Sequence, residues 1–117
     1  MEKENKKENK NTTQMRKGIL EYCILLIIAK NEIYASRLIE ELKSVGLIVV
    51  EGTIYPLLTR LKNAGFFTYV WREAGQGPPR KYYSISQVGL EELKAQESAW
   101  LETMNFVETL RTKFKNH

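Results

Sequence analysis

The chain has 117 residues, of which 43% are hydrophobic, so it has room for one compact domain with a modest core and a peripheral element. Its 18 Lys and Arg residues exceed its 14 acidic residues, and the formal net charge of +4 permits an anionic partner without proving one. Every acidic residue is Glu, a helix former, and Asp is absent, which favours a helical protein.

The same composition excludes several classes of protein. Cys23 and His117 are the only residues of their types, so an intrachain disulfide is impossible and a metal site cannot be assembled. Without a credible nucleophile, general base or phosphate-binding loop, we predict neither an enzyme nor a cofactor. The apolar run around Cys23 is interrupted by Glu21 and Lys30, so it is too short to span a bilayer, which needs about twenty apolar residues. A signal peptide is not expected either, and we predict a cytoplasmic protein. Cys23 is expected to be buried and reduced, and a redox-sensing thiol is the alternative.

The N-terminal region divides into an arm and a helix. Residues 1–11 are Lys, Glu and Asn with almost no apolar side chain, and they predict a disordered arm. A first helix is expected from Thr12 or Thr13, either of which is a good N-cap, to about Lys30. Apolar residues recur along it at spacings of three and four, which predicts one buried stripe.

Two further helices are expected over about residues 34–44 and 52–64. A glycine follows each, Gly46 and Gly65, and both are expected to stop their helices. Pro56 lies close enough to the start of the third helix that it would cost at most one hydrogen bond.

A β-hairpin is predicted next. Residues 66–73 and 80–85 are rich in aromatic and β-branched residues, and the Gly- and Pro-rich residues 75–79 separate them as a turn. Trp71 is expected to pack at the base of this hairpin.

Ser86 is expected to cap a last, long helix over residues 87–114. Its apolar residues form a stripe with heptad spacing. Packing of this stripe on the first helix is possible, but burial against a second copy of the chain is the prediction. The expected dimer-interface residues are Leu93, Trp100, Met104, Val107, Leu110 and Phe114.

These elements predict a mainly α fold of the α+β kind. We divide it into a disordered arm at residues 1–11, a domain of three helices and a hairpin at residues 12–86, and a dimerisation helix at residues 87–114.

Two motifs stand out: residues 53–61 read TIYPLLTRL, and residues 77–89 read GPPRKYYSISQVG. Both resemble motifs of the PadR family of bacterial transcriptional regulators. The resemblance covers residues 13–113 and implies a winged helix-turn-helix with a two-stranded wing and a single C-terminal dimerisation helix, as in the compact branch of the family. It also implies a dimeric repressor that binds double-stranded DNA at promoter operators. The chain departs from the family at Tyr34-Ala35, where a Gly-Tyr pair is common, so a DNA contact by that second Tyr is not carried over.

On the third helix, Thr53, Tyr55 and Thr59 are expected to face the major groove, because the apolar residues mark the opposite side. Glu51 precedes them and can accept a hydrogen bond from cytosine. Tyr55 has the alternative of packing under the hairpin. Arg60 has two interpretations, a phosphate contact and a structural ion pair.

The other expected DNA contacts come from the hairpin and the start of the first helix. Side chains alternate along a strand, so one of the two neighbouring tyrosines is expected to be exposed, and we assign Tyr83 to that role. The pair at the start of the first helix has an ordinary solvated role as its alternative. The residues in this group are Arg16, Lys17, Arg72, Arg80, Lys81 and Tyr83.

Trp100 is expected to pack in the dimer seam. The resemblance to ligand-responsive members of the family allows a second role, in which Trp100 borders a cavity for a small, planar, aromatic effector. The main alternative to a DNA-binding regulator is a winged-helix adaptor that binds another protein and does not bind DNA specifically.

Overall fold

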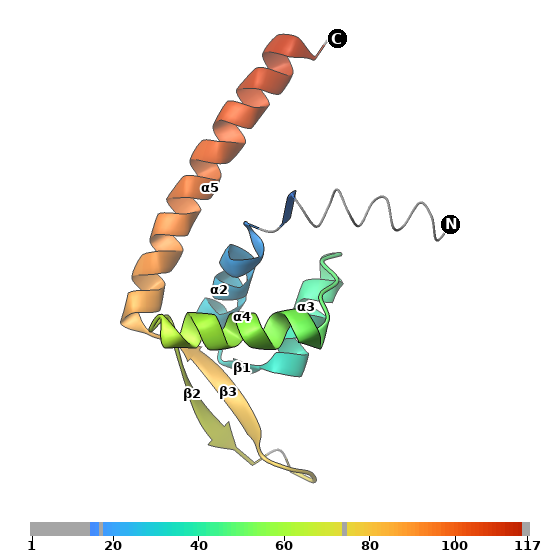
Figure 1. Ribbon diagram of the computed structural model, residues 1–117, viewed down its shortest axis with the longest axis vertical. Coiled ribbons are helices and arrows are strands. Elements are labelled where there is room, and N and C mark those ends of the chain that lie inside the picture. Colours follow the sequence, from blue (N-terminus) through green and yellow to red (C-terminus); the bar gives the residue numbers. More distant parts are fainter. Residues whose placement is uncertain (1–14, 17, 74, 116–117) are drawn as a thin grey trace, which may run out of the picture.

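The computed structural model describes residues 15–16, 18–73 and 75–115 (Figure 1). The predicted order of three helices, a hairpin and a long helix is confirmed. In chain order the elements are α2 (Leu20–Lys30), β1 (Ile33–Tyr34), α3 (Ala35–Ser44), α4 (Glu51–Asn63), β2 (Phe67–Arg72), β3 (Arg80–Ile85) and α5 (Gln87–Phe114).

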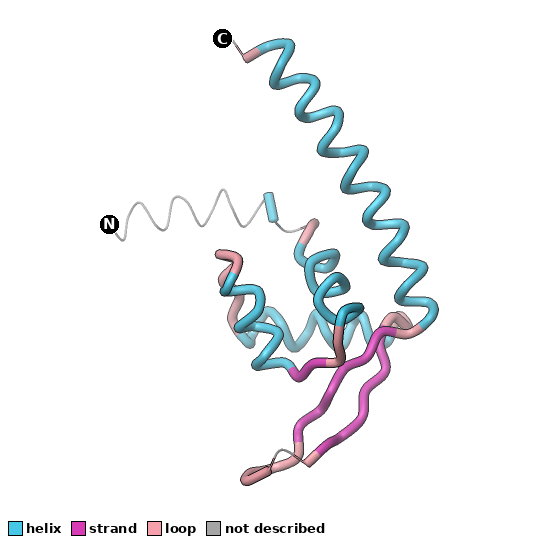
Figure 2. Tube along the Cα trace, turned by 180° about the vertical axis from the view of Figure 1, so that it is seen from behind, coloured by secondary structure: helices cyan, strands magenta, loops and turns pink. Residues whose placement is uncertain are grey.

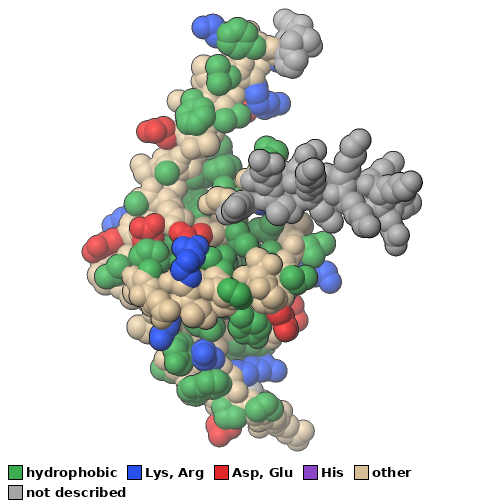
Figure 3. Space-filling model, in the orientation of Figure 1, with side chains coloured by type: hydrophobic (Ala, Val, Ile, Leu, Met, Phe, Trp, Pro, Cys, Tyr) green, Lys and Arg blue, Asp and Glu red, His purple; other side chains and the backbone are tan. Residues whose placement is uncertain are grey.

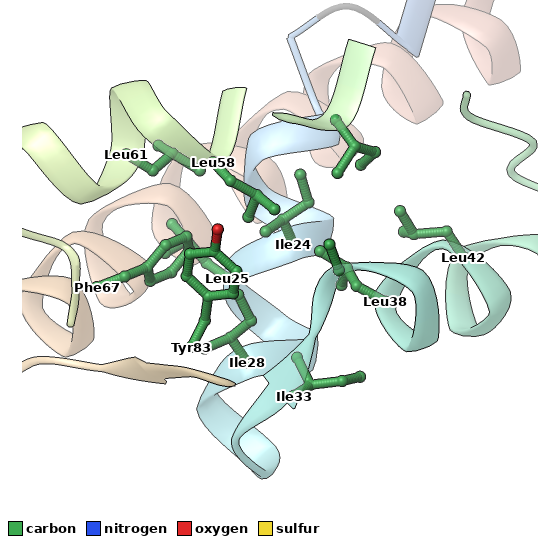
Figure 4. Close-up of a cluster of buried hydrophobic side chains, with 12 residues drawn as sticks. Ile24, Leu25, Ile28, Ile33, Leu38, Leu42, Leu58, Leu61, Phe67 and Tyr83 are labelled. Carbon is green, nitrogen blue, oxygen red and sulfur yellow. The ribbon is translucent and has the colours of Figure 1, made fainter. Parts of the chain in front are cut away.

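A single hydrophobic core holds the three short helices against the sheet (Figure 4). In each helix the buried side chains follow the helical period, which places one apolar stripe inward and leaves the other faces to solvent. The core residues are Ile24, Leu25, Ile28, Ile33, Ala35, Leu38, Leu42, Ile54, Leu58, Leu61, Phe67 and Tyr83.

The helix ends predicted from two glycines are confirmed. Gly46 follows α3 with a φ of 90°, and Gly65 follows α4 with a φ of 88°, a conformation that a residue without Cβ adopts at low cost. In each case the backbone amide of the residue after the glycine donates to a carbonyl in the last turn of the helix. The Leu47 amide donates to the Leu42 carbonyl at 2.9 Å, and the Phe66 amide donates to the Leu61 carbonyl at 3.0 Å. Pro56 lies inside α4, and the helix continues through it.

The sheet has one more strand than predicted. The wing strands β2 and β3 are antiparallel, and Phe67 pairs with Ile85 at the base and Arg72 with Arg80 near the open end. The short strand β1 pairs with the other edge of β3, which gives the order β1-β3-β2. The two residues of β1 were too few for a strand pattern in the sequence, and Tyr34 was expected to begin the second helix.

The beginning of the chain also differs from the prediction. Met15 and Arg16 are helical, a turn at Gly18 and Ile19 follows, and α2 starts only at Leu20. The expected arm at residues 1–11 and the expected N-caps Thr12 and Thr13 lie outside the described residues.

The C-terminal part of the long helix α5 projects away from the other elements, as Figures 1 and 2 show from opposite sides. Ser86 caps it as predicted, because its Oγ accepts from the amide of Gly89 at 2.9 Å and donates to the carbonyl of Gly65. The first turns of α5 thereby adjoin the end of α4, and Leu93 packs against the core. The second half of the helix is exposed.

We expect Gly89→Ala to lower the free energy of unfolding by about 2–3 kcal/mol. A Cβ at this position would overlap the Phe66 carbonyl oxygen and lie 2.7 Å from Ile85 Cγ1. Gly52→Ala is the matched control, because a Cβ there has no neighbour within 4 Å. This substitution is expected to raise the free energy of unfolding by about 0.5–1 kcal/mol. Urea unfolding monitored by circular dichroism measures both, and equal stability of the two variants would contradict the proposed junction.

Candidate nucleic-acid interface

Helix α4 presents a polar face to solvent. Ile54, Leu58 and Leu61 are buried, and the predicted base-contacting residues Glu51, Thr53, Tyr55 and Thr59 are all exposed. The first turn of α4 contains Glu51, where a carboxylate is favoured by the helix dipole. The tertiary structure therefore leaves the predicted face of this helix accessible.

The exposed residues of α4 fall on two flanks. Thr53 and Arg60 are seven positions apart and share one flank, and Tyr55 and Lys62 share the other. The Arg60 flank faces α2, because Arg60 Nη2 lies 2.8 Å from Glu21 Oε1. The structural ion pair that was one alternative for Arg60 is therefore present.

The flank with Tyr55 and Lys62 adjoins the wing. Lys62 Nζ lies 5.5 Å from the centre of the Tyr69 ring in β2. Lys81 Nζ, from β3, lies 4.4 Å from the same ring and 5.3 Å from the ring of Trp71. An ammonium over an aromatic face is attracted by the ring quadrupole, so these contacts place two positive charges on one side of the sheet.

We call this surface the wing–helix strip, and it consists of Tyr55, Lys62, Tyr69, Trp71 and Lys81. Tyr55 is 46% exposed and Trp71 is 62% exposed, so the strip combines accessible aromatic rings with cations. Figure 3 shows Lys and Arg side chains gathered over the sheet below α4. The strip can bind a polyanion that also follows the polar face of α4.

The opposite face of the wing carries a second set of cations. Arg72 and Arg80 stand directly across from each other, an arrangement of like charges that is unfavourable without compensation. Arg72 pairs with Glu32 at 2.7 Å, and the Arg80 guanidinium lies 4.3 Å from the centre of the Tyr34 ring. Arg72 is therefore held in an ion pair, and Arg80 remains exposed on an aromatic support.

The structure corrects the assignment of Tyr83 to the DNA-binding surface. Tyr83 is only 7% exposed, because it alternates with Tyr82 along β3 and points into the core. Burial, followed by the neighbouring Tyr55 and Tyr69, raises the pKa of its hydroxyl. Arg16 is exposed as expected, and Lys17 lies outside the described residues.

Two members of the strip were missed or misplaced by sequence reasoning. Lys62 was not assigned a role, although its position seven residues after Tyr55 is the signal that could have found it. Trp71 was expected at the base of the hairpin. The register pairs it with Lys81, one position from the Arg72–Arg80 pair at the end of the ladder, and there it is exposed.

A groove of about 620 Å³ lies between the beginning of α2 and the middle of α5. Trp100 lies in its wall, and Tyr22 and Met104 are among the other lining residues. Burial and the nearby Glu97 carboxylate raise the pKa of Tyr22, and its hydroxyl donates to Glu97 Oε1 at 3.4 Å. Trp100 is half-buried here. Leu93, which was predicted to lie in the dimer interface, is partly buried against the core of its own chain.

Two further findings concern chemistry and membranes. Cys23 is half-buried rather than fully buried, and burial raises the pKa of its thiol, which opposes formation of the reactive thiolate at neutral pH. Within the described ranges there is no group of three His, Cys, Asp or Glu side chains arranged to hold a metal ion. In that same part of the chain, no helix has the length and apolar character needed to cross a membrane.

Three helices, a basic hairpin and a polar face on the third helix define a winged helix-turn-helix protein. Comparison with family models agrees, because the model described as the transcriptional regulator PadR-like family matches residues 24–95. The chain therefore belongs to the PadR-like family of transcriptional regulators, which are not enzymes.

Solved structures support the same assignment. A PadR-like transcription factor from Bacteroides fragilis is 50% identical with a TM-score of 0.73, and the match covers 86% of this chain and 98% of that one. A PadR-like transcriptional regulator from Bacillus cereus is 40% identical with a TM-score of 0.77, over 83% and 95% of the two chains. A PadR family regulator from Eggerthella lenta is 26% identical with a TM-score of 0.81, over 94% and 96%. Among curated proteins, none is significantly similar to the chain.

We expect Lys62→Gln and Lys81→Gln each to weaken DNA binding similarly on all sequences. If each lysine neutralises one phosphate, the slope of log affinity against log salt should decrease by about one for each lysine that is replaced. Fluorescence anisotropy with a labelled duplex at several salt concentrations measures this slope. Arg111→Gln removes the same charge from the far end of α5 and is the control. A control that changes the slope as much as the strip variants would refute the placement of DNA on the strip.

Proposed function

We propose that this regulator is a dimeric, sequence-specific repressor that binds promoter operators. The observation that carries the proposal is the wing–helix strip, which continues the exposed face of α4 with two lysines held over Tyr69. An α-helix fits the major groove of DNA, and cations beside the helix are placed to contact the phosphates that border that groove.

Individual roles follow from exposure. Thr53, Thr59 and Glu51 are proposed to contact base edges, because their short or acidic side chains lie on the exposed turns of α4. Tyr55 is proposed to contact DNA at the border between helix and wing. Lys81 is proposed to bind phosphate from the strip.

Other cations support binding at the edges of the surface. Arg80 and Arg16 are exposed, and we propose phosphate contacts for them. Arg72 is proposed to hold the wing through Glu32. Arg60 is proposed to reach a phosphate only when it separates from Glu21, which now holds its guanidinium.

The second half of α5 supports the dimer. Met104, Phe106, Val107 and Leu110 are between 43% and 54% exposed along consecutive turns, and exposed hydrophobic side chains follow α5 in Figure 3. Burying the remaining surface of each would contribute about 1 kcal/mol or more, and a dimer doubles this number of side chains. We propose that residues 87–114 form the dimerisation helix and residues 12–86 the DNA-binding domain.

The groove beside Trp100 supports an effector site. Its volume of about 620 Å³ is in the range of pockets that hold small molecules, and its wall contains an aromatic ring. We extend the proposal to a small planar aromatic ligand that regulates the dimer. Calorimetric titration of the dimer with aromatic probes tests this part.

The protein is expected to bind the DNA immediately upstream of its own gene in preference to unrelated DNA. Small regulators are expected to control transcription of their own genes, so this fragment is a good first place to look for an operator. Anisotropy at near-physiological salt with excess competitor DNA measures specific binding and its salt slope. Equal, weak binding to both DNAs at every salt concentration would favour the alternative, a winged-helix adaptor for another protein.

Leu110→Glu is expected to lower the affinity of the dimer by at least about tenfold, since it places a charge in the apolar face of α5. Sedimentation equilibrium over a range of protein concentrations measures the dissociation constant. Asn105→Glu places the same charge on the opposite side of the helix and should leave the dimer intact. A dimer through this face would be contradicted if both variants dissociated equally, or if neither variant dissociated more than the wild-type protein.

A further inference from the structure

Two residues on the exposed side of α4 weaken the helix that carries them. The first is Gly52, which lies in the first turn, and glycine is less favourable than alanine within a helix. Its backbone is helical and does not have a positive φ, and a Cβ at this position would have no neighbour within 4 Å. Neither the backbone conformation nor packing within the chain therefore requires a glycine here.

The second residue is Pro56, which lies inside α4 and beyond its first turn. Proline has no backbone N–H, so the carbonyl of Gly52, four residues earlier, lacks the donor that an α-helix normally supplies. The proline ring also crowds the carbonyl at that position. Pro56 is exposed, so burial of its ring in the core does not explain its presence.

Both residues lie along the middle of the exposed face of α4. Gly52, Pro56 and Thr59 follow one another at spacings of four and three, which places them on one line of the helix surface. This line runs opposite the buried side of the helix, between the flank that carries Arg60 and the flank that carries Lys62. The side chains along it are short or absent, so an approaching surface comes closest to the helix backbone here.

The carbonyl of Gly52 is an acceptor that can read DNA. A helix in the major groove presents its exposed face to the base edges. Carbonyls on the solvent side of a helix tilt outward, and this one has no Cβ beside it to keep a base edge away. Adenine N6 and cytosine N4 carry the exocyclic amino groups of the major groove, and each donates hydrogen bonds to oxygen acceptors.

We propose that Gly52 and Pro56 form a base-reading site on α4. There the helix backbone approaches the base edges, and the Gly52 carbonyl accepts a hydrogen bond from the exocyclic amino group of an adenine or a cytosine. This inference rests on the proposed function and adds to it a backbone contact that specifies sequence. Two residues that each weaken α4 share its DNA-facing line, and local rules of stability are commonly broken at functional sites.

Alanine at either position separates the stability of the protein from its binding to DNA. We expect Gly52→Ala and Pro56→Ala each to raise the urea midpoint of unfolding and to lower affinity for the operator by about tenfold. In Gly52→Ala the new methyl group keeps the helix from the bases, and in Pro56→Ala a new amide N–H occupies the Gly52 carbonyl. Circular dichroism in urea and fluorescence anisotropy with the operator fragment measure the two quantities.

Ser98→Ala is the matched control, because Ser98 is exposed inside α5 and alanine there also favours the helix. It should raise the midpoint and leave operator affinity unchanged. The slope of log affinity against log salt should remain that of the wild-type protein in all three variants, since none changes a charge. Wild-type affinity in either α4 variant, or a slope that decreases together with affinity, would overturn the proposal.

The donor on the DNA is identified by removing one amino group at a time. Purine replaces adenine, and 2-pyrimidinone replaces cytosine, at successive positions of the operator. At one such position we expect wild-type protein and Ser98→Ala to lose about fivefold or more in affinity. Gly52→Ala and Pro56→Ala should lose little further there, because their acceptor is already out of reach or occupied. All four proteins are compared on the same DNA, so weaker base pairing in the modified duplex cancels.

The two levels of the proposal fail in different ways. If no position shows this difference between the proteins, the carbonyl contact is overturned. Wild-type protein that binds the operator fragment no better than unrelated DNA would overturn the proposed function, and the base-reading site with it. Specific binding by wild-type protein that Gly52→Ala and Pro56→Ala leave unchanged would overturn the base-reading site alone.

Discussion

The burial of one face of α4 against α3 and the sheet is the constraint on which the rest of the structure depends. Ile54, Leu58 and Leu61 are fully buried, and this orientation determines which side chains of α4 remain in solvent. A rotation of the helix would bury Tyr55 or Arg60 and expose leucines, at a cost of about 2 kcal/mol for each buried leucine. The polar face and its two flanks are therefore a consequence of core packing.

The wing depends on the same core through its register. Phe67 and Tyr83 are buried at the base, and the period of two along each strand then directs Trp71 and Lys81 to the same side as these core residues. Because the hairpin extends beyond the core, these last side chains meet solvent. One alternating pattern thus produces packing residues at one end of the sheet and a cationic, aromatic surface at the other.

The helix α5 is tied to this domain at its beginning and exposes apolar residues toward its end. Ser86 hydrogen-bonds to both Gly65 and Gly89, so its side chain connects the end of α4 to the start of α5. Glu21 and Gln96 add a polar link between α2 and α5 at the edge of the groove. Through its other oxygen, Glu21 also accepts from Arg60 of α4, so its side chain contacts three helices.

The sequence by itself determined the order of the helices and the hairpin, because helical and strand periods, the glycine stops and the Ser86 cap are local properties. It also identified the exposed face of α4, since the apolar residues of one helix define its buried side. It missed β1, whose two residues are too few for a strand period. Only the tertiary structure decided that Tyr83 is buried, that Arg60 and Arg72 are paired, and that Leu93 packs on the core. Strand alternation says that two neighbours point in opposite directions without saying which points inward, and an ion pair such as Glu21–Arg60 joins residues far apart in the chain. Such facts depend on how elements pack on one another, and no local pattern contains that information.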